Sequence, residues 1–327
     1  MNNFCTLFDS NYLSKGMLMY ESLIKHEPAS HLYIFPFDDK AYQVLKNLNL
    51  SNATIIKMSD FENDKLLAVK ITRTATEYCW TCTPSIIDYT LQTYQVTSCT
   101  YLDADLFFYN SPAVLINEMP SEYSVLITPH RYTPQYDQAD TSGIYCVQFI
   151  TFKNNMDSLK VLEWWRDACI NWCYNKTEDG KFGDQKYLDD WPQRFEGIVW
   201  VLKNIGGGVA PWNVQQYRFS KTNKNKIDGI ENSTGNAFEL IFFHFHGLSF
   251  QKIKSSFYES QAIKFKTGYL LSDNCISVIY TPYIKQLLSK AHFIQKKFKV
   301  IIKNTSTVNI GLKQRLKISF KKRILNW

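Results

Sequence analysis

The first hundred residues alternate short apolar runs with amphipathic stretches, and this alternation restricts the possible folds more than any other feature. Apolar runs with strand character lie at residues 4–8, 32–36 and 54–56. Between them, residues 12–25 and 40–48 carry apolar side chains at helical spacing. Strands that alternate with helices pair most readily with parallel neighbours. The order therefore predicts an α/β fold with a mainly parallel sheet.

Two acidic residues follow the next predicted strand. A helix is expected over residues 83–95 with Pro84 in its first turn, then a strand over 99–102, then Asp103 and Asp105. Ligands bind at the carboxyl ends of strands in open α/β sheets. Acids at i and i+2 on an extended chain face the same side, about 6–7 Å apart at their Cα atoms. They can bracket one divalent cation; the alternative is a polar strand end that faces water.

Further elements are expected downstream of this acidic pair. Residues 125–128 and 144–152 read as strands, and residues 157–174 read as a helix. A polar loop, His130–Asp140, separates the two strands, and Ile205–Val209 contains three glycines where backbone could approach a ligand. The fingerprints of Rossmann and P-loop nucleotide sites do not occur.

Two later segments contain candidate site residues. Asp184 and Gln185 follow Gly183, and the simplest interpretation of Asp184 is a helix N-cap. His244 and His246 end an apolar strand, and alternation along that strand puts them on one face. Two histidines on one face at a strand end are better metal candidates than a lone histidine.

In combination, these segments resemble a known enzyme family. Tyr101–Phe108, Gly183-Asp184-Gln185 and His244-Phe245-His246-Gly247 look like the motifs of GT-A-fold, nucleotide-sugar-dependent glycosyltransferases of family eight, such as the bacterial lipopolysaccharide galactosyl- and glucosyltransferases and glycogenin. The resemblance covers roughly residues 3–250. A bacterial subgroup also shares the segments Trp80–Pro84, Ser124–Arg131, Trp164–Arg166 and Gly183–Pro192.

The resemblance implies a fold and a reaction. The expected fold is the GT-A nucleotide-diphospho-sugar transferase fold, with a mixed, mainly parallel central sheet flanked by helices and a basic helical C-terminal tail. The expected enzyme is a hexosyltransferase, retaining by resemblance, that moves a sugar from a nucleotide-diphospho-sugar, UDP-sugar above others, to a saccharide or lipid-linked acceptor. Its place would be cell-surface polysaccharide or lipopolysaccharide biosynthesis.

Roles for individual residues follow from the resemblance alone. Asp103, Asp105 and His244 are the implied ligands of Mn²⁺ or Mg²⁺, with His246 as a substitute. Asp184 and Gln185 are the implied catalytic pair beside the donor sugar. The residues implied to contact the nucleotide sugar are Thr6, Asp9, Asp103 and Gly247. His130–Asp140 is the candidate acceptor loop because it is long, polar and close to this predicted site.

The sequence departs from the family pattern at two places. Where the family usually has Tyr-Asn-x-Gly, this chain has Tyr145-Cys146-Val147-Gln148, which leaves the donor sugar open. The Lys-Pro-Trp that usually follows the histidine motif is replaced by Ser249-Phe250-Gln251, and Lys252 or Lys254 could supply the missing basic contact to the diphosphate.

Charge is concentrated at the C-terminus. Residues 290–327 hold nine Lys, two Arg and no acid, a formal charge of +11 against +7 for the whole chain. Cations interleaved with apolar residues predict binding to an anionic membrane surface, although a solvated tail is an alternative. We expect a GT-A domain over residues 1–255 and a C-terminal extension over 256–327.

Composition and the N-terminus predict where the protein works. Met1–Asp9 lacks the features of a secretory signal, and no stretch approaches the roughly 20 apolar residues of a membrane span. We expect a cytoplasmic protein, peripheral on the inner face of the membrane, and no nucleic-acid partner, because no recognition motif accompanies the basic tail.

Two other functions fit parts of the sequence. A sugar nucleotidyltransferase would carry a basic, glycine-rich N-terminal loop, a character that Asn11–Gly16 lacks. A catalytically degenerate GT-A protein that binds carbohydrate or membrane is favoured by the altered strand at Cys146 and Gln148.

Overall fold

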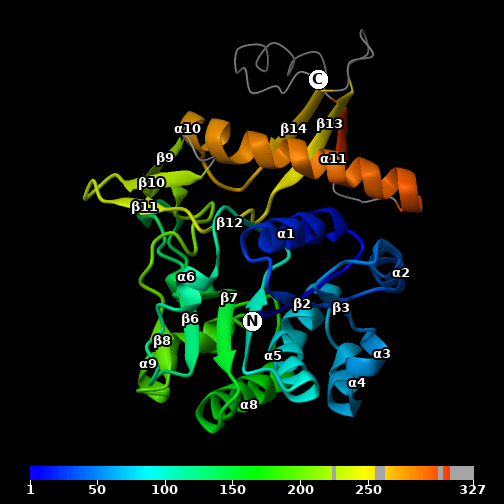
Figure 1. Ribbon diagram of the computed structural model, residues 1–327, viewed down its shortest axis with the longest axis vertical. Helices are drawn as coiled ribbons and strands as arrows, with labels where there is room; N and C mark the ends of the chain where they lie inside the picture. Colours follow the sequence, from blue (N-terminus) through cyan, green and yellow to red (C-terminus); the bar gives the residue numbers. More distant parts are fainter. Residues whose placement is uncertain (223–225, 255–261, 301–304, 310–327) are drawn as a thin grey trace.

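A computed structural model describes residues 1–222, 226–254, 262–300 and 305–309 of this chain (Figure 1). A seven-stranded sheet forms its centre, in the order β3-β2-β1-β4-β7-β6-β8. Its strands are β1 Asn3–Phe8, β2 His31–Pro36, β3 Ala53–Ile55, β4 Ser98–Leu102, β6 Val125–Pro129, β7 Tyr145–Lys153 and β8 Val199–Val201.

The sheet is mixed but mainly parallel. β1 pairs in parallel with β2 and β4, β2 with β3, and β6 with β8. β7 is antiparallel to both of its neighbours, β4 and β6. The predicted mixed, mainly parallel sheet is therefore confirmed, and the carboxyl ends of β1 and β4 lie at one edge where a site can form.

Helices cover both faces of the sheet. The helices are α1 Leu13–His26, α2 Asp39–Leu48, α3 Met58–Phe61, α4 Asp64–Lys70, α5 Ala75–Tyr94, α6 Ala113–Ile116, α7 Ala139–Ser142, α8 Met156–Asn171, α9 Trp191–Arg194, α10 Asp273–Cys275 and α11 Thr281–Phe298. Side chains of α3, α4, α5 and α8 share one hydrophobic core. Those of α1, α2 and α6, with Ile294 of α11, share the other. Figure 1 shows α5 and α8 on the opposite side of the sheet from α1.

The central strand β1 supplies both cores. All six of its residues are buried. Cys5 and Leu7 enter the core beneath α5, whereas Phe4 and Phe8 enter the core beneath α1. This is the alternation that a strand buried on both faces requires. Burial on both faces explains why the sequence of β1 reads as a continuous apolar run.

The helix expected at residues 83–95 begins earlier. Thr74 caps α5 with a reciprocal capping box, in which its hydroxyl accepts from the Glu77 backbone and Glu77 accepts from the Thr74 backbone. Pro84 therefore lies inside the helix and not in its first turn, so that placement was wrong. The capping pattern Thr-x-x-Glu was a stronger signal than the proline.

Smaller sheets extend from the central one. β5 Leu106–Phe108 pairs antiparallel with β12 Phe242–His244. β9 Tyr217–Lys221, β10 Ile227–Glu231 and β11 Ala237–Glu239 form a three-stranded sheet. A further sheet joins β13 Ser249–Lys254, β14 Ala262–Lys266 and β15 Thr305–Asn309.

The C-terminal helix α11 lies along α1, as Figure 1 shows in orange and dark blue. Ile294 is fully buried in the core beneath α1, and Lys290 forms an ion pair with Glu21. A π-helix, Ile276–Tyr280, leads into α11. The basic tail is thus helical over residues 290–298, but the expectation of a helical tail was wrong for residues 305–309, which form β15 beside β13. Residues 301–304 and 310–327 lie outside the described part of the chain. Within that described part, no helix is both long and apolar enough to cross a membrane.

Candidate active site

The two acids predicted from the sequence lie where β4 ends. Asp103 and Asp105 occupy the short turn between β4 and β5, which the backbone N–H of Leu106 closes on the carbonyl of Asp103 at 3.2 Å. The backbone N–H of Asp103 donates to the carbonyl of Gln148 at 3.0 Å, which ties the turn to β7. The acids therefore sit on a braced turn at the carboxyl end of a central strand.

Strand pairing brings His244 to the same place. β12 runs antiparallel to β5 with His244 opposite Leu106, the residue after Asp105. The backbone N–H of Phe245 donates to the carbonyl of Asp105 at 2.9 Å, so the two strands stay paired up to the acid. The register of two short strands, 139 positions apart at His244 and Asp105, thus assembles the site.

The three side chains form a compact cluster. His244 Nε2 lies 3.0 Å from Asp105 Oδ1 and 3.6 Å from Asp103 Oδ2. One ligand atom from each of the three residues lies within 4.8 Å of the others. Two carboxylate oxygens and one imidazole nitrogen are donors that suit Mn²⁺ or Mg²⁺. The structure therefore brings the predicted ligand set Asp103, Asp105 and His244 together.

His246 stands beside this cluster but outside the three-residue group. Its ring centroid lies 5.5 Å from that of His244, and its side chain lines the two cavities, described below, that His244 also lines. The sequence predicted that His244 and His246 share one face of a strand. In the structure β12 ends at His244, so His246 lies beyond the strand. Burial, with the neighbouring His244, lowers the pKa of His246 to about 4, so its imidazole is neutral near neutral pH.

A buried lysine completes the charge balance. Lys15 of α1 places its Nζ 3.3 Å from Asp105 Oδ2, with both side chains more than nine-tenths buried. Burial alone would raise the pKa of Asp105, but Lys15 and His244 outweigh it and hold that pKa well below its usual value. Burial and the charge of Asp105 raise the pKa of Asp103, against the opposing pull of His244.

Sequence reasoning missed Lys15. It lies on a helix whose buried face is otherwise mostly apolar, and no motif marks it. A lysine at a buried position of an amphipathic helix was the available signal, because a buried cation needs an acidic partner.

Two adjacent cavities meet at the cluster. One, of about 300 Å³, opens at the end of β1 and includes Asp9, Tyr12 and Phe37 in its lining. The other, of about 340 Å³, extends over β7 toward Asp184 and Gln185. Both cavities are lined in part by Thr76, Trp80, Asp103, His244 and His246. The predicted metal ligands thus lie at the boundary between two ligand-sized spaces.

Asp184 and Gln185 line the second cavity. Trp165 Nε1 donates to the carbonyl of Asp184 at 2.9 Å, and Gln185 Nε2 donates to the carbonyl of Ser142 at 2.7 Å. Burial, reinforced by the carboxylate of Asp103, raises the pKa of Asp184 to about 7. Asp184 does not act as a side-chain cap for the short helix that follows, Lys186–Asp190, because Gln185 occupies the N-cap position.

The residues predicted to contact the nucleotide sugar separate into two groups. Asp9 lines the first cavity, and its carboxylate accepts from the backbone N–H groups of Asn11 and Tyr12. Thr6 is fully buried within β1 and lines neither cavity of the cluster. Gly247 adopts a positive φ of +66° after β12 and also lies outside both linings.

The three glycines at 206–208 pack against protein and line neither cavity. A Cβ on Gly206 would lie 2.0 Å from the carbonyl oxygen of Glu239. Gly208 has φ +95°, and a Cβ there would lie 2.8 Å from Thr128. The expectation that this backbone approaches a ligand was wrong, because its close neighbours are β11 and β6.

In the segment Tyr145–Gln148, which departs from the family pattern, only one of the two altered residues lies at a cavity. Cys146 lines the second cavity, but Gln148 is fully buried and lines neither. The Gln148 amide lies next to Gly208, 3.6 Å from the position of its missing Cβ. The extra bulk of Gln148 is therefore absorbed behind the site, and only Cys146 is in a position to touch a ligand.

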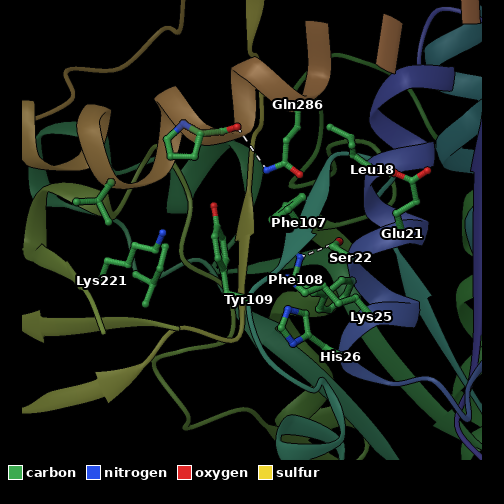
Figure 2. Close-up of a pocket in the computed structure, with 13 residues that line it drawn as sticks. Leu18, Glu21, Ser22, Lys25, His26, Phe107, Phe108, Tyr109, Lys221 and Gln286 are labelled. Atoms are coloured by element: carbon green, nitrogen blue, oxygen red, sulfur yellow. Dashed lines mark hydrogen bonds between the residues drawn. The ribbon is translucent and has the colours of Figure 1, made fainter. Parts of the chain in front are cut away.

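A separate cavity of about 460 Å³ lies between α1, β5, β9 and α11 (Figure 2). Its lining includes Lys25 and His26 of α1, Tyr109 and Lys221. None of the residues predicted for the site lines it, so it is distinct from the two cavities at the Asp–Asp–His cluster.

Two curated proteins of Bacillus subtilis (strain 168) are similar in sequence to this chain. The uncharacterized protein YfnD is 31% identical over 302 residues, which cover 90% of this chain and 92% of YfnD. The uncharacterized protein YfnF is 29% identical over 251 residues, which cover 75% of this chain and 80% of YfnF. No family model matches the chain.

Solved glycosyltransferases are similar in structure. Mouse xyloside xylosyltransferase 1 in its apo form aligns with a TM-score of 0.48 and 10% identity, over 75% of this chain and 97% of that one. The galactosyltransferase LgtC, solved with donor and acceptor sugar analogues, aligns with a TM-score of 0.45 and 14% identity, over 75% and 87%. Both TM-scores are below 0.5, and the fold of this chain is established by its own strand order and register.

Proposed function

This chain belongs to the same family as the uncharacterized protein YfnD of Bacillus subtilis. Because it holds an Asp–Asp–His cluster between two cavities at the carboxyl edge of an α/β sheet, we propose that it is a metal-dependent glycosyltransferase. It moves a sugar from a nucleotide-diphospho-sugar, a UDP-sugar above others, to a saccharide or lipid-linked acceptor. The observation that carries the proposal is the convergence of Asp103, Asp105 and His244 within 4.8 Å at the carboxyl edge of the sheet.

The cluster fits a divalent cation. Two of its donors come from the hydrogen-bonded turn after β4 and the third from the end of β12, and two of the three side chains are buried. Carboxylates and a neutral imidazole are typical ligands of Mn²⁺ and tolerate Mg²⁺. When bound there, such an ion supplies positive charge that stabilises a departing nucleoside diphosphate. Asp103, Asp105 and His244 are the residues that would hold it.

The two cavities divide the donor between them. The cavity with Asp9, Tyr12 and Phe37 suits the nucleoside, because it combines aromatic rings with polar groups at the end of β1. The diphosphate then lies at the cluster, and the donor sugar enters the second cavity beside Asp184 and Gln185. This division uses both spaces and puts the sugar–phosphate bond at their boundary.

Asp184 and Gln185 act on the sugar in this proposal. The sugar passes through an oxocarbenium-like state. An ionised Asp184 stabilises the positive charge of that state, and the amide of Gln185 orients the sugar. Because the pKa of Asp184 is raised to about 7 in the unliganded protein, this carboxylate gains its charge within the physiological range. The reaction is expected to retain the anomeric configuration.

The acceptor and the cellular location follow from the basic end of the chain. Residues 290–327 carry eleven basic residues and no acid, which favours contact with anionic lipid headgroups. We therefore assign the enzyme to surface-polysaccharide or lipopolysaccharide assembly, on the inner face of the cytoplasmic membrane.

The test is thermal stabilisation by UDP or GDP, each with Mn²⁺ and with EDTA. Ligands that bind only the folded protein raise Tm in proportion to the logarithm of their concentration over Kd. We expect stabilisation by one nucleotide with Mn²⁺ that disappears in EDTA and in Asp105→Ala. Absence of a shift with every nucleotide would favour a degenerate GT-A protein. Stabilisation by a nucleoside triphosphate together with a sugar phosphate would favour a nucleotidyltransferase.

A further inference from the structure

The cavity beside Asp184 is walled by aromatic rings. Its lining includes Trp80, His130, Tyr132, Trp212 and Tyr269. His130 and Tyr132 stack with centroids 4.5 Å apart at an interplanar angle of 14°. Trp212 meets His130 edge-on at 5.1 Å. His130, Tyr132, Trp212 and Tyr269, together called the aromatic wall, therefore form one connected aromatic surface that faces the space next to the cluster.

Hydrogen bonds fix this wall in place. Trp212 Nε1 and Asn213 Nδ2 both donate to the carbonyl of His130, at 2.9 and 2.8 Å. Trp212 and His130 are buried to more than nine-tenths. Rings held in one orientation lose little conformational freedom when a ligand packs on them. The wall is therefore built before any ligand arrives.

Tyr269 reaches the wall from the C-terminal part of the chain. It follows β14, and its ring lies 4.9 Å from Tyr136 and 6.5 Å from Trp212. The next residue anchors the segment: the backbone N–H of Leu270 donates to Tyr136 Oη at 2.7 Å, and its carbonyl accepts from Gln215 Nε2 at 2.8 Å. The segment at residues 269–270 thus packs against the 130–142 loop and completes one side of the cavity.

The charge-bearing groups of the cavity are two carboxylates and the imidazole of His244, which Asp105 already binds. Among the described residues, its lining contains no Lys and no Arg, but it does contain Asp103 and Asp184. Burial lowers the pKa of His130 to about 3, so this imidazole stays neutral. His244 is engaged by Asp105 at 3.0 Å and by Asp103 at 3.6 Å, so an anionic group beside the aromatic rings would face carboxylates with no free cation in the described lining to compensate it. The occupant is therefore uncharged.

We propose that the aromatic wall is the acceptor subsite, that it receives an uncharged pyranose by its apolar C–H face, and that Tyr269 determines which acceptor fits. The proposal rests on the proposed function. A pyranose ring presents C–H groups on one face, and aromatic rings are the side chains best suited to cover that face. Gln138 and Ser142, also in the lining, are available to its hydroxyl groups.

The experiment compares acceptor KM with donor hydrolysis. The donor is the sugar nucleotide that the protein hydrolyses best, and the probes are octyl β-glucoside, octyl β-galactoside and the anionic octyl β-glucuronide. Tyr269→Ala is expected to raise the KM for the preferred neutral glycoside about tenfold, the cost of one lost ring contact. Tyr269→Phe keeps the ring and stays within about twofold of wild type.

The remaining measurements separate this inference from the proposed function. Tyr94→Ala, an exposed tyrosine at the end of α5, controls for the loss of a ring elsewhere. Donor hydrolysis without acceptor is the reference rate, and stabilisation by UDP with Mn²⁺ stays unchanged in Tyr269→Ala, because Tyr269 does not line the cavity assigned to the nucleoside. An unchanged acceptor KM in Tyr269→Ala, or equal use of the glucuronide and the neutral glycosides, would overturn the inference while leaving the enzyme a glycosyltransferase.

A second readout does not depend on turnover. Saturation-transfer NMR with methyl β-glucoside, methyl β-galactoside and methyl β-glucuronide reports binding to the cavity directly. We expect signals from the C–H groups of a neutral glycoside that weaken in Tyr269→Ala and persist in Tyr269→Phe. Equal signals from all three glycosides, or signals that Tyr269→Ala leaves intact, would contradict an uncharged subsite completed by Tyr269.

Discussion

Lys15 and Asp105 form a buried ion pair across 90 positions of sequence, with Lys15 Nζ 3.3 Å from Asp105 Oδ2. The other carboxylate oxygen of Asp105 faces His244 at 3.0 Å. The carboxylate is therefore oriented from both sides before any ion binds, which fixes its geometry in the cluster. Lys15 also lies against the ring of Tyr12, with Nζ 4.5 Å from the ring centroid, so it is held between α1 and the site.

Replacing Lys15 with Met leaves Asp105 buried beside Asp103 without its cation. Removing one partner of a buried ion pair costs about 3–5 kcal/mol, so Lys15→Met is expected to lower the free energy of unfolding by about that amount in EDTA. A divalent cation restores positive charge next to Asp105, so Mn²⁺ stabilises the variant more than wild type. Guanidinium unfolding in EDTA and in Mn²⁺ measures both effects.

Lys70→Met is the matched control. Lys70 pairs with Glu62 near the surface and is 45% exposed, and exposed pairs contribute about 0–1 kcal/mol. Equal losses of stability in the two variants, with the same response to Mn²⁺, would show that Lys15 does not balance the charge of Asp105.

Asp184 makes stability depend on pH in a specific direction. Its pKa rises from 3.8 to about 7 on folding, so the folded protein keeps a proton that the unfolded chain releases. That contribution to stability is complete below pH 3.8 and is lost as pH rises toward 7. Asp184→Asn removes the loss. The free energy of unfolding of Asp184→Asn should exceed that of wild type by about 4 kcal/mol at pH 8, and the difference should vanish at low pH.

The measurement is urea unfolding of both proteins at pH 5 and pH 8 in EDTA. Asp167→Asn, at an exposed position of α8, serves as the control for the chemical change. A stability difference between Asp184→Asn and wild type that stays the same at both pH values would show that Asp184 does not hold a proton in the folded protein.

Gly206 connects backbone packing to the metal cluster. A Cβ at this position would lie 2.0 Å from the carbonyl oxygen of Glu239, a backbone atom that cannot move independently. Gly206 also accepts from the N–H groups of Ile241 and Phe242, where β12 starts. Gly206→Ala is therefore expected to cost about 1–3 kcal/mol or more and to displace His244.

Gly268→Ala is the control, because a Cβ added at Gly268 would meet nothing within 4 Å. Thermal scans with and without UDP and Mn²⁺ distinguish the two glycines. Gly206→Ala should lose stability and part of the nucleotide shift, and Gly268→Ala should lose neither. A full nucleotide shift in Gly206→Ala would show that the position of β12 is independent of this contact.

The basic tail is predicted to hold the protein on anionic membranes. Residues 290–298 belong to α11, and Ile294 is part of the core, so deletion from residue 290 would damage the fold. Deletion of residues 310–327 removes six basic residues and no acid, and it leaves both α11 and β15 in place. Each cation contributes about 1 kcal/mol near such a surface.

Co-sedimentation with vesicles of anionic and of neutral lipids tests the tail. The full chain should bind the anionic vesicles and dissociate as salt rises, while the truncated chain stays in the supernatant with its nucleotide-dependent thermal shift intact. Equal partition of the two proteins would contradict a role of residues 310–327 in membrane binding.

Local sequence patterns predicted much of the fold and the centre of the site. The strand just before Asp103 and the strand that ends at His244 were predictable, because each is a short apolar run followed by polar residues. Motif order then linked them. The Thr74-x-x-Glu77 capping box also marks the start of α5, and it is a more reliable signal than the proline ten residues later, which the helix accommodates in its interior.

The remaining features depend on contacts between distant segments. Lys15 is an ordinary helical lysine until α1 packs beside Asp105, and Tyr269 is an ordinary loop tyrosine until its segment reaches Tyr136. The sequence could not predict that Thr6 is buried away from both cavities, because a strand buried on both faces gives no signal of where it meets a cavity. Such pairings arise from tertiary packing, which no local period encodes.

The most direct test of the proposed reaction is the release of nucleoside diphosphate from a panel of UDP- and GDP-sugars, in Mn²⁺ and in EDTA, by wild type, His244→Ala and His246→Ala. His244 belongs to the cluster of three ligand atoms and His246 does not. We expect release from one class of donor that requires Mn²⁺, falls at least a hundredfold in His244→Ala, the scale of a lost interaction worth about 2.7 kcal/mol, and largely survives in His246→Ala. Release that continues in EDTA and in His244→Ala would contradict a metal-dependent transfer at this cluster.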